Sequence, residues 1–264
     1  MKAGFFLSLA FAAIVLTGCS LGVDRFQATS DGVTYDMEVV APLTNFVRIA
    51  SVTTSEPLSG EVVIPPTVKY GRTTYMVSQI GKGAFRDFSR LTSVTLPSTV
   101  SVIEEKAFMG CTSLEEINTP QPLSTIGAYA FDGCASLEDF SLQASISTLG
   151  EGCFRGCSSL ASVTFPTSLN HIPPMAFQGC TSLGSIFIDS TVLTIGEKAF
   201  AGCTGVVSFV CMTPTPPATF DNTFVGMNPE IPVTVPMASV EQYYDAVGWR
   251  YFAGYQGRYQ TVSK

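Results

Sequence analysis

Apolar residues recur at intervals of 23 positions along the middle of the chain. One column holds phenylalanine in every unit, and three further columns hold isoleucine, leucine, valine or phenylalanine. The four columns are Phe85, Phe108, Phe131, Phe154, Phe177 and Phe200; Ile80, Ile103, Ile126, Leu149, Ile172 and Ile195; Leu91, Leu114, Leu137, Leu160, Leu183 and Val206; and Val94, Ile117, Phe140, Val163, Ile186 and Phe209. A constant period of this size is typical of solenoids, whose units bury their apolar faces only against their neighbours. The pattern predicts six stacked units over residues 80–211 that share one core.

Within one unit, apolar and polar positions predict the path of the backbone. After Leu91 the chain alternates, with Val94 and Leu96 inward and the polar residues between them outward, which indicates a short strand paired in parallel with the next unit. Val100 and Ile103 return inward as a second short strand. The segment 105–111 then resembles one tight helical turn, which a glycine such as Gly110 ends.

The repeating unit Ile-Gly-x-x-Ala-Phe-x-Gly-Cys-x-Ser-Leu-x-x-Ile-x-x-Pro-x-Ser-Val resembles the BspA-like leucine-rich repeat of bacterial surface proteins. The resemblance covers residues 80–211, and residues 59–81 resemble the degenerate first repeat of that family. It implies a β-rich solenoid, a right-handed superhelix of short parallel strands and single helical turns. Two departures, Arg86-Asp87-Phe88 and Pro173-Pro174, affect single turns and leave this fold unchanged.

Both ends of a solenoid need a cover, because an apolar layer and a bare strand edge would otherwise face water. Residues 24–79 alternate in β fashion and predict an N-terminal cap that includes the degenerate first repeat. Residues 212–264 predict a C-terminal cap, with a short helix followed by an aromatic closure. The aromatic residues there could seal the last unit or, if exposed, stack on sugar rings; they are Tyr243, Tyr244, Trp249, Tyr251, Phe252, Tyr255 and Tyr259.

The first 18 residues read as a secretory signal, with Lys2 followed by a short apolar run. Leu16-Thr17-Gly18-Cys19 resembles the bacterial lipoprotein processing box, which implies a lipid on Cys19 followed by a linker over residues 19–23. We therefore expect the mature chain in the bacterial cell envelope, lipid-anchored, at the outer membrane, where it would face either the periplasm or the outside. Loss of Lys2 moves the formal net charge from -7 to -8. So acidic a chain is not expected to bind nucleic acid, which requires a basic patch.

The cysteines form another column of the same period, joined by Cys153 and Cys211; its members are Cys111, Cys134, Cys157, Cys180 and Cys203. Equivalent positions in stacked units point the same way, so buried thiols are favoured, with one or two disulfides or a metal site as alternatives. His171 is the only histidine, and no second ligand pair accompanies Cys153 and Cys157. No metal or other cofactor is expected.

The outward positions of the longer strands are the candidate binding surface. Stacking would turn them into a ribbon about 30 Å long, at roughly 4.8 Å per strand. The candidate ligand-binding residues are Ser93, Glu116, Asn118, Asp139, Ser141, Ser162, Thr164, Ser185, Phe187, Ser208 and Val210. Small polar residues could equally serve only to keep the sheet soluble, with Phe187 covered by the C-terminal cap.

These observations predict a non-catalytic, lipid-anchored adhesion or binding protein whose partner is a protein or a polysaccharide. A structural spacer within an envelope complex is the alternative. A carbohydrate-active enzyme is a third, because glycosidases need only two carboxylates, and acids cluster in adjacent units. Those acids are Glu104, Glu105, Glu115, Glu116, Glu138 and Asp139.

Overall fold

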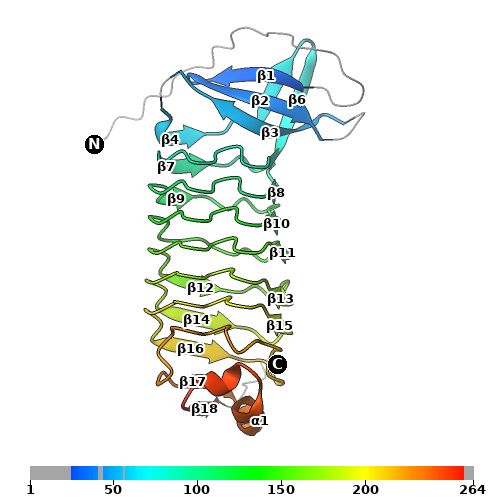
Figure 1. The fold of residues 1–264 in the computed structure, drawn as a ribbon. Coiled ribbons are helices and arrows are strands. Elements are labelled where there is room, and N and C mark those ends of the chain that lie inside the picture. Colours follow the sequence, from blue (N-terminus) through cyan, green and yellow to red (C-terminus); the bar gives the residue numbers. More distant parts are fainter. Residues whose placement is uncertain (1–24, 41–43, 56, 259–264) are drawn as a thin grey trace, which may run out of the picture.

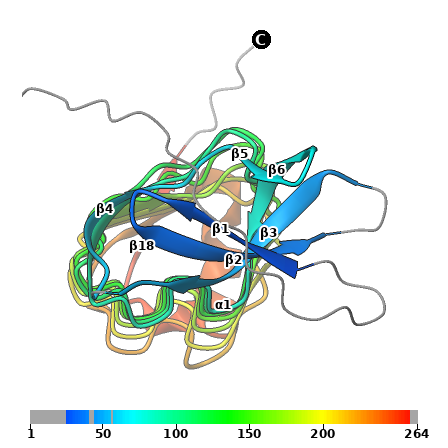
Figure 2. The same ribbon diagram turned by 90° about the horizontal axis from the view of Figure 1, so that it is seen from above.

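The computed structural model describes residues 25–40, 44–55 and 57–258. It is a β-solenoid of about 8 turns with repeats of about 23 residues, so the predicted fold is confirmed. Figure 1 shows a β-rich N-terminal part at one end of the stack and the helix α1 (Val240–Asp245) at the other. Viewed from above, the successive turns superpose on one another (Figure 2).

The N-terminal part joins the solenoid through a continuous sheet. Its strands are β1 (Arg25–Ser30), β2 (Val33–Val39), β3 (Phe46–Thr53), β4 (Ser59–Val63), β5 (Thr67–Tyr70) and β6 (Thr73–Ile80). β1, β2 and β3 form an antiparallel meander, β3 pairs with β6 in parallel, and β6 also pairs with β5 and with the first short strand of the repeats. The apolar core therefore passes from one part to the other without a break.

Each repeat contributes to two faces. The first, which we call the long-strand face, lies on the left in Figure 1 and contains β4, β7 (Arg90–Thr95), β9 (Glu116–Ile117), β12 (Ser162–Thr164), β14 (Ser185–Ile188), β16 (Ser208–Cys211), β17 (Val233–Pro236) and β18 (Tyr255–Arg258). The second, the short-strand face, contains β8 (Val102–Ile103), β10 (Thr125–Ile126), β11 (Thr148–Leu149), β13 (His171–Ile172) and β15 (Thr194–Ile195). Pairing between successive units is parallel on both faces, as predicted.

A ladder of phenylalanine rings runs through the core. From Phe85 to Phe200, neighbouring rings stack with centroids 5.1 to 5.6 Å apart and planes within 16° of parallel. Every ring of this column is buried, and so are the isoleucine and leucine columns beside it. Stacked aromatic pairs contribute about 0.5–1.5 kcal/mol each beyond the burial of their area. The ladder therefore stabilises each unit against its neighbour.

The segment expected to form a single helical turn is a run of tight turns. The main-chain N–H groups of Ala107, Met109 and Cys111 each donate to the carbonyl three residues earlier, at 3.1 to 3.3 Å. The N–H groups between them, such as that of Phe108, donate to the carbonyls of the next unit. Main-chain donors thus alternate between closing the turn and holding the stack. As predicted, the glycine that ends the turn has a positive φ, 76° at Gly110.

The cysteine column lies inside the stack. All seven cysteines of the described residues are buried free thiols. Five of them donate from Sγ to the carbonyl of a phenylalanine in the preceding unit at 3.0 to 3.2 Å; the pairs are Cys111–Phe85, Cys134–Phe108, Cys157–Phe131, Cys180–Phe154 and Cys203–Phe177. In four of the five pairs the same carbonyl also accepts a main-chain N–H within its own tight turn, so the thiol is a second donor to it from the next unit.

Pro173 accounts for a break in the short-strand face. In the other units the residue at this position donates its N–H to the preceding unit, as Gly150 does to Ile126 (2.8 Å) and Gly196 to Ile172 (2.8 Å). Proline has no N–H to donate. The ladder accordingly ends at β11 and resumes as the separate pair β13–β15.

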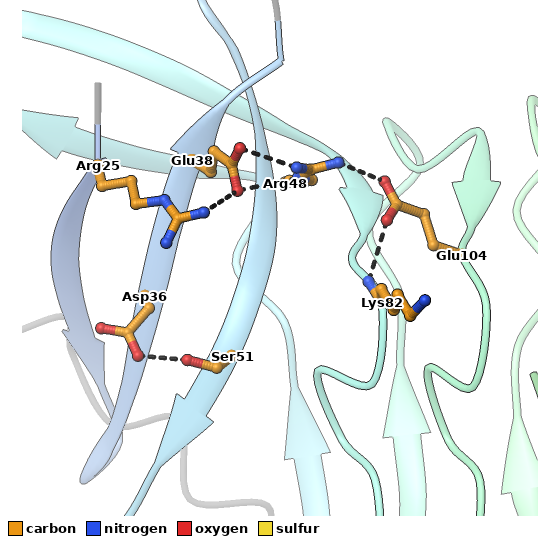
Figure 3. A network of polar contacts seen from close by, with 7 residues as sticks. All are labelled: Arg25, Asp36, Glu38, Arg48, Ser51, Lys82 and Glu104. Atoms are coloured by element: carbon orange, nitrogen blue, oxygen red, sulfur yellow. Dashed lines mark hydrogen bonds and ion pairs between the residues drawn. The ribbon is translucent and has the colours of Figure 1, made fainter. Parts of the chain in front are cut away.

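A half-buried polar network fastens the N-terminal strands to the repeats (Figure 3). Arg48 on β3 holds Glu38 on β2 with two hydrogen bonds of 2.8 and 3.2 Å, and it reaches Glu104 in the repeats at 3.0 Å. Glu104 also accepts the main-chain N–H of Lys82 at 3.0 Å. Arg25 completes the network on the far side of Glu38.

The C-terminal segment continues the stack before closing it. Phe224 stacks on Phe200 at 6.2 Å, and β17 and β18 extend the long-strand sheet, so the segment begins with an irregular further turn. The expected helix is α1, flanked by η1 (Met237–Ser239) and η2 (Trp249–Tyr251). Trp249 is buried and donates to the carbonyl of Pro217 at 2.8 Å, and Tyr243 and Phe252 are buried beside it. These three aromatic residues seal the core, as predicted, whereas Tyr244 is exposed and Tyr259 lies outside the described residues.

The close approach of successive turns predicts the effect of one substitution. A Cβ at Gly150 would lie 2.2 Å from the main-chain nitrogen of Ala128, whereas at Gly184 its nearest neighbour would be the Ala161 carbonyl at 3.8 Å. We expect Gly150→Ala to lower the free energy of unfolding by about 2–4 kcal/mol. Gly184→Ala should leave it within about 0.5 kcal/mol. Urea denaturation followed by circular dichroism compares the two, and equal stability of both variants would contradict the packing described.

The buried thiols predict a loss of stability in alkali. Burial raises the pKa of Cys111 and of Cys203 to about 12, and raises those of Cys134, Cys157 and Cys180 well above the ordinary thiol value. In the unfolded chain these thiols ionise near pH 8.5, so the stabilisation is complete below that pH and is lost as pH rises towards the folded pKa, by about 1.4 kcal/mol per pH unit for each thiol. The midpoint of thermal unfolding should fall steeply between pH 8 and about 10. In Cys134→Ala one thiol fewer contributes, so the thermal midpoint should fall less steeply with pH than in the unsubstituted protein. A midpoint that does not change with pH would contradict the buried thiol column.

Candidate functional site

The outer positions of the long-strand face lie in register from unit to unit. Ser162, Ser185 and Ser208 are direct neighbours on β12, β14 and β16. In the next column Thr164 neighbours Phe187, Phe187 neighbours Val210, and β17 and β18 extend the row beyond the predicted ribbon with Thr234 and Gln256. At the other end of the ribbon, Ser93 on β7 neighbours Glu116 on β9.

Phe187 is the apolar centre of this ribbon. Its side chain is 37% exposed, and the C-terminal segment does not cover it. Its strand neighbours Ile186 and Ile188 are buried, so Phe187 points to the outside of the sheet while they point to the core. A large apolar side chain thus stands between Thr164 and Val210 in a row of smaller residues.

Asn118 has a different role from the other candidates. Its side-chain amide donates to the carbonyl of Leu96 at 2.9 Å, and its side-chain oxygen accepts the N–H of Leu96 at 2.6 Å. The side-chain amide therefore makes the two hydrogen bonds that a paired strand residue would make between these turns. Asn118 therefore holds the two turns together, and only one N–H and one lone pair of its amide remain for other partners.

The long-strand sheet is interrupted at the third unit. β4, β7 and β9 form one sheet, and the strands from β12 to β18 form another. Asp139 and Ser141, which sequence places on a strand of the ribbon, lie between the two on a segment without strand structure. A single main-chain hydrogen bond, from Ala161 to Glu138 at 3.1 Å, joins this segment to the residues before β12.

Like charge explains the interruption. Glu116 and Asp139 occupy the same position in successive units, and so do Glu115 and Glu138. A closed ladder would hold each pair about 4.8 Å apart, and like charges directly opposite one another destabilise strand pairing. All four side chains are exposed, and no ion pair within the described residues involves them.

An open hollow of about 460 Å³ lies at the interruption. Its lining residues come from the segment without strand structure and from β12 and the residues just after it. They are Asp139, Phe140, Ser141, Leu142, Ser162, Thr164 and Pro166. Gln143 stands beside it, and its side-chain amide donates to Ser141 (3.0 Å) and to Thr119 (3.2 Å). The sequence gives one signal for this site, the acidic residues repeated at the interval of one unit, but not the hollow itself.

Other candidate chemistry lies apart from the ribbon. His171 is on the short-strand face, where its Nδ1 contacts the hydroxyl of Thr194. Among the described residues no three histidine, cysteine or acidic side chains converge as metal ligands. The thiols are buried, and burial raises their pKa, so none is held as a thiolate nucleophile at neutral pH.

The proposed lipid attachment at Cys19 lies outside the described residues, as do the signal segment and the whole of the linker. Within residues 25–258, apart from the omitted positions, no helix has the length and apolarity needed to cross a bilayer.

Comparisons with known proteins agree with the repeat architecture. Residues 78–207 match six copies of the family described as BspA type leucine rich repeat region. A solved leucine-rich repeat protein of T. pallidum is 28% identical, with a TM-score of 0.66 over 73% of this chain and 86% of its own. One from Bacteroides ovatus is 21% identical, with a TM-score of 0.53 over 87% of this chain and 76% of its own, and so shows the fold. No curated protein matches the sequence.

The repulsion between stacked acids predicts a stabilising substitution. Serine occupies the position of Asp139 in the three units that follow, where the ladder is closed. We expect Asp139→Ser to raise the free energy of unfolding by about 0.5–1 kcal/mol, because it removes one like-charge pair. Glu197→Ser, at an exposed acid remote from the cluster, should leave it unchanged. Thermal unfolding at low ionic strength measures both, and a destabilised Asp139→Ser would contradict this explanation.

Proposed function

Because residues 78–207 are a BspA-type leucine-rich repeat region, we propose that the chain is a non-catalytic binding protein of the bacterial cell envelope. The long-strand face is the binding surface. Solenoids use extended faces of this kind to hold partners, since stacking places equivalent side chains at regular intervals along one line. The ligand is an extended molecule from outside the cell.

The observation that carries this proposal is the exposed Phe187 in the row of Thr164, Val210 and Thr234. Exposed aromatic residues surrounded by small polar ones are typical of the centre of an interaction surface. A ribbon that served only to keep the sheet soluble would not need an exposed phenylalanine here. Around Phe187 the serine and threonine hydroxyls offer both donors and acceptors to a ligand.

The envelope location rests on the N-terminal sequence. The processing box at Leu16–Cys19 favours cleavage before Cys19 and acylation of its thiol and new amino terminus. Several acyl chains, at about 0.8 kcal/mol for each buried CH2, are enough to hold a soluble domain at a membrane. Adhesion to host or neighbouring cells is the role that such a placement supports.

The absence of catalysis is supported by the nature of the relatives and of the side chains. The matching family and the matching solved proteins are leucine-rich repeat proteins, and none is of a catalytic family. Glu115, Glu116, Glu138 and Asp139 stand exposed on an open face, and Glu104 and Glu105 are held in ion pairs. These carboxylates do not line an enclosed cleft that would exclude water from a reaction.

Binding to arrayed matrix proteins and glycans tests the ribbon. The mature chain, residues 19–264, in detergent should bind at least one arrayed ligand, and Phe187→Ala should weaken that binding about tenfold through loss of a buried aromatic contact. Leu193→Ala is the matched control, because Leu193 is a more exposed apolar residue on the other face of the turn. Equal binding by both variants would show that the row of Phe187 on the long-strand face is not the binding surface. No binding to any ligand, with capture of other envelope proteins, would favour a structural spacer instead.

A further inference from the structure

The interruption of the long-strand sheet leaves part of a strand edge open. β14 is paired on both sides, with β12 and with β16. β12 is paired on the β14 side alone, and its other edge faces residues 139–142. Beyond the bond from Ala161 to Glu138, no main-chain hydrogen bond among the described residues joins these two segments. Main-chain donors and acceptors of this edge therefore open on the hollow.

Polar and apolar groups are combined in the lining of the hollow. Asp139 supplies an exposed carboxylate, and Ser141, Ser162 and Thr164 supply hydroxyls. Its apolar contributors are the half-buried Pro166 and the edges of Phe140 and Leu142, whose side chains are otherwise buried in the core. A volume of 460 Å³ lies within the range of about 300–1,000 Å³ usual for small-ligand sites.

We propose that this hollow binds one sugar residue of a polysaccharide, either neutral or carrying an amino group. The inference rests on the proposed function and identifies the ligand class for that same face. A pyranose ring presents hydroxyls at its rim and C–H groups on its faces, and the lining combines a carboxylate, hydroxyls and open main-chain groups with the apolar surface of Pro166 and the edges of Phe140 and Leu142. Ionised Asp139 accepts two sugar hydroxyls at once, and such charge-assisted bonds are the stronger ones.

The surrounding charge restricts which sugars can bind. Glu116 and Glu138 stand next to Asp139, and no lysine or arginine lines the hollow. Sulfated and uronic-acid sugars are repelled by this field, whereas an amino group is attracted by it.

A peptide strand is a poorer occupant of the same place. β12 has three residues, and Pro166, which follows closely, has no N–H to offer. Strand addition requires a longer edge with alternating donors and acceptors. Thr164 is also the direct neighbour of Phe187, so a chain of sugars that starts in the hollow continues along the ribbon.

The acidic pairs support a functional reading of the interruption. Asp139 keeps a sheet open that serine closes in the later units, at the expense of local stability. Departures from a local structural rule without a compensating contact are typical of functional sites.

Glycan binding by the full mature chain in detergent tests this inference. The probes are oligomers of glucosamine, N-acetylglucosamine and mannose, with a sulfated polysaccharide as the negative probe, followed by calorimetry with the tightest binder. We expect binding to a neutral or amino sugar oligomer and a loss of at least tenfold in affinity for Asp139→Asn. Glu197→Gln makes the same charge change at an exposed acid remote from the hollow and should alter affinity less than threefold.

The outcomes separate this inference from the proposed function. Binding of oligosaccharide that Asp139→Asn does not weaken, or binding of the sulfated polymer alone, would overturn the sugar subsite. Binding of matrix proteins alone, with sensitivity to Phe187→Ala, would also overturn it while leaving the long-strand face as the binding surface. Thermal unfolding of Asp139→Asn checks that its fold is retained, and Asp139→Ser, more stable yet unable to bind, would give independent support.

Discussion

The stacking of equal units at close range is the constraint on which the rest of this structure depends. Successive phenylalanine rings lie 5.1 to 5.6 Å apart from Phe85 to Phe200, so each turn is held at nearly the distance of paired strands. At that spacing, main-chain atoms of adjacent turns approach so closely that a side chain at Gly150 has no room. Every equivalent residue is consequently repeated along a straight line on the surface.

This constraint explains which features could be predicted from the sequence. Column positions such as Phe131 and Leu137 are inward in every unit because the period fixes their direction, and the thiol of Cys134 follows the same rule. The period does not predict which side chains of adjacent turns bond to one another when the residues differ from unit to unit. Asn118 occupies a ribbon position but turns its amide towards Leu96, and only the geometry of the two turns reveals this.

The interruption of the sheet is likewise a feature that the repeat period does not predict. Glu116 and Asp139 are visible in the sequence as acids one unit apart, yet their effect depends on the balance between repulsion and strand pairing in that turn. Likewise, the irregular spacing before Phe224 hides a further turn that the packing makes evident. The regular spacing predicts the architecture, whereas the candidate binding site lies at a departure from that spacing.

The two breaks in the stack differ in this respect. Pro173 removes one donor on the short-strand face. The break at Asp139 lies on the other face, carries uncompensated charge and opens a hollow beside the exposed Phe187 row. An acyl group at Cys19 would hold the protein at the end where β1 begins, six residues later at Arg25. The hollow lies beside β12, about midway along the stack (Figure 1). A surface of this form is suited to a polymer that lies along the axis and is fixed at one residue.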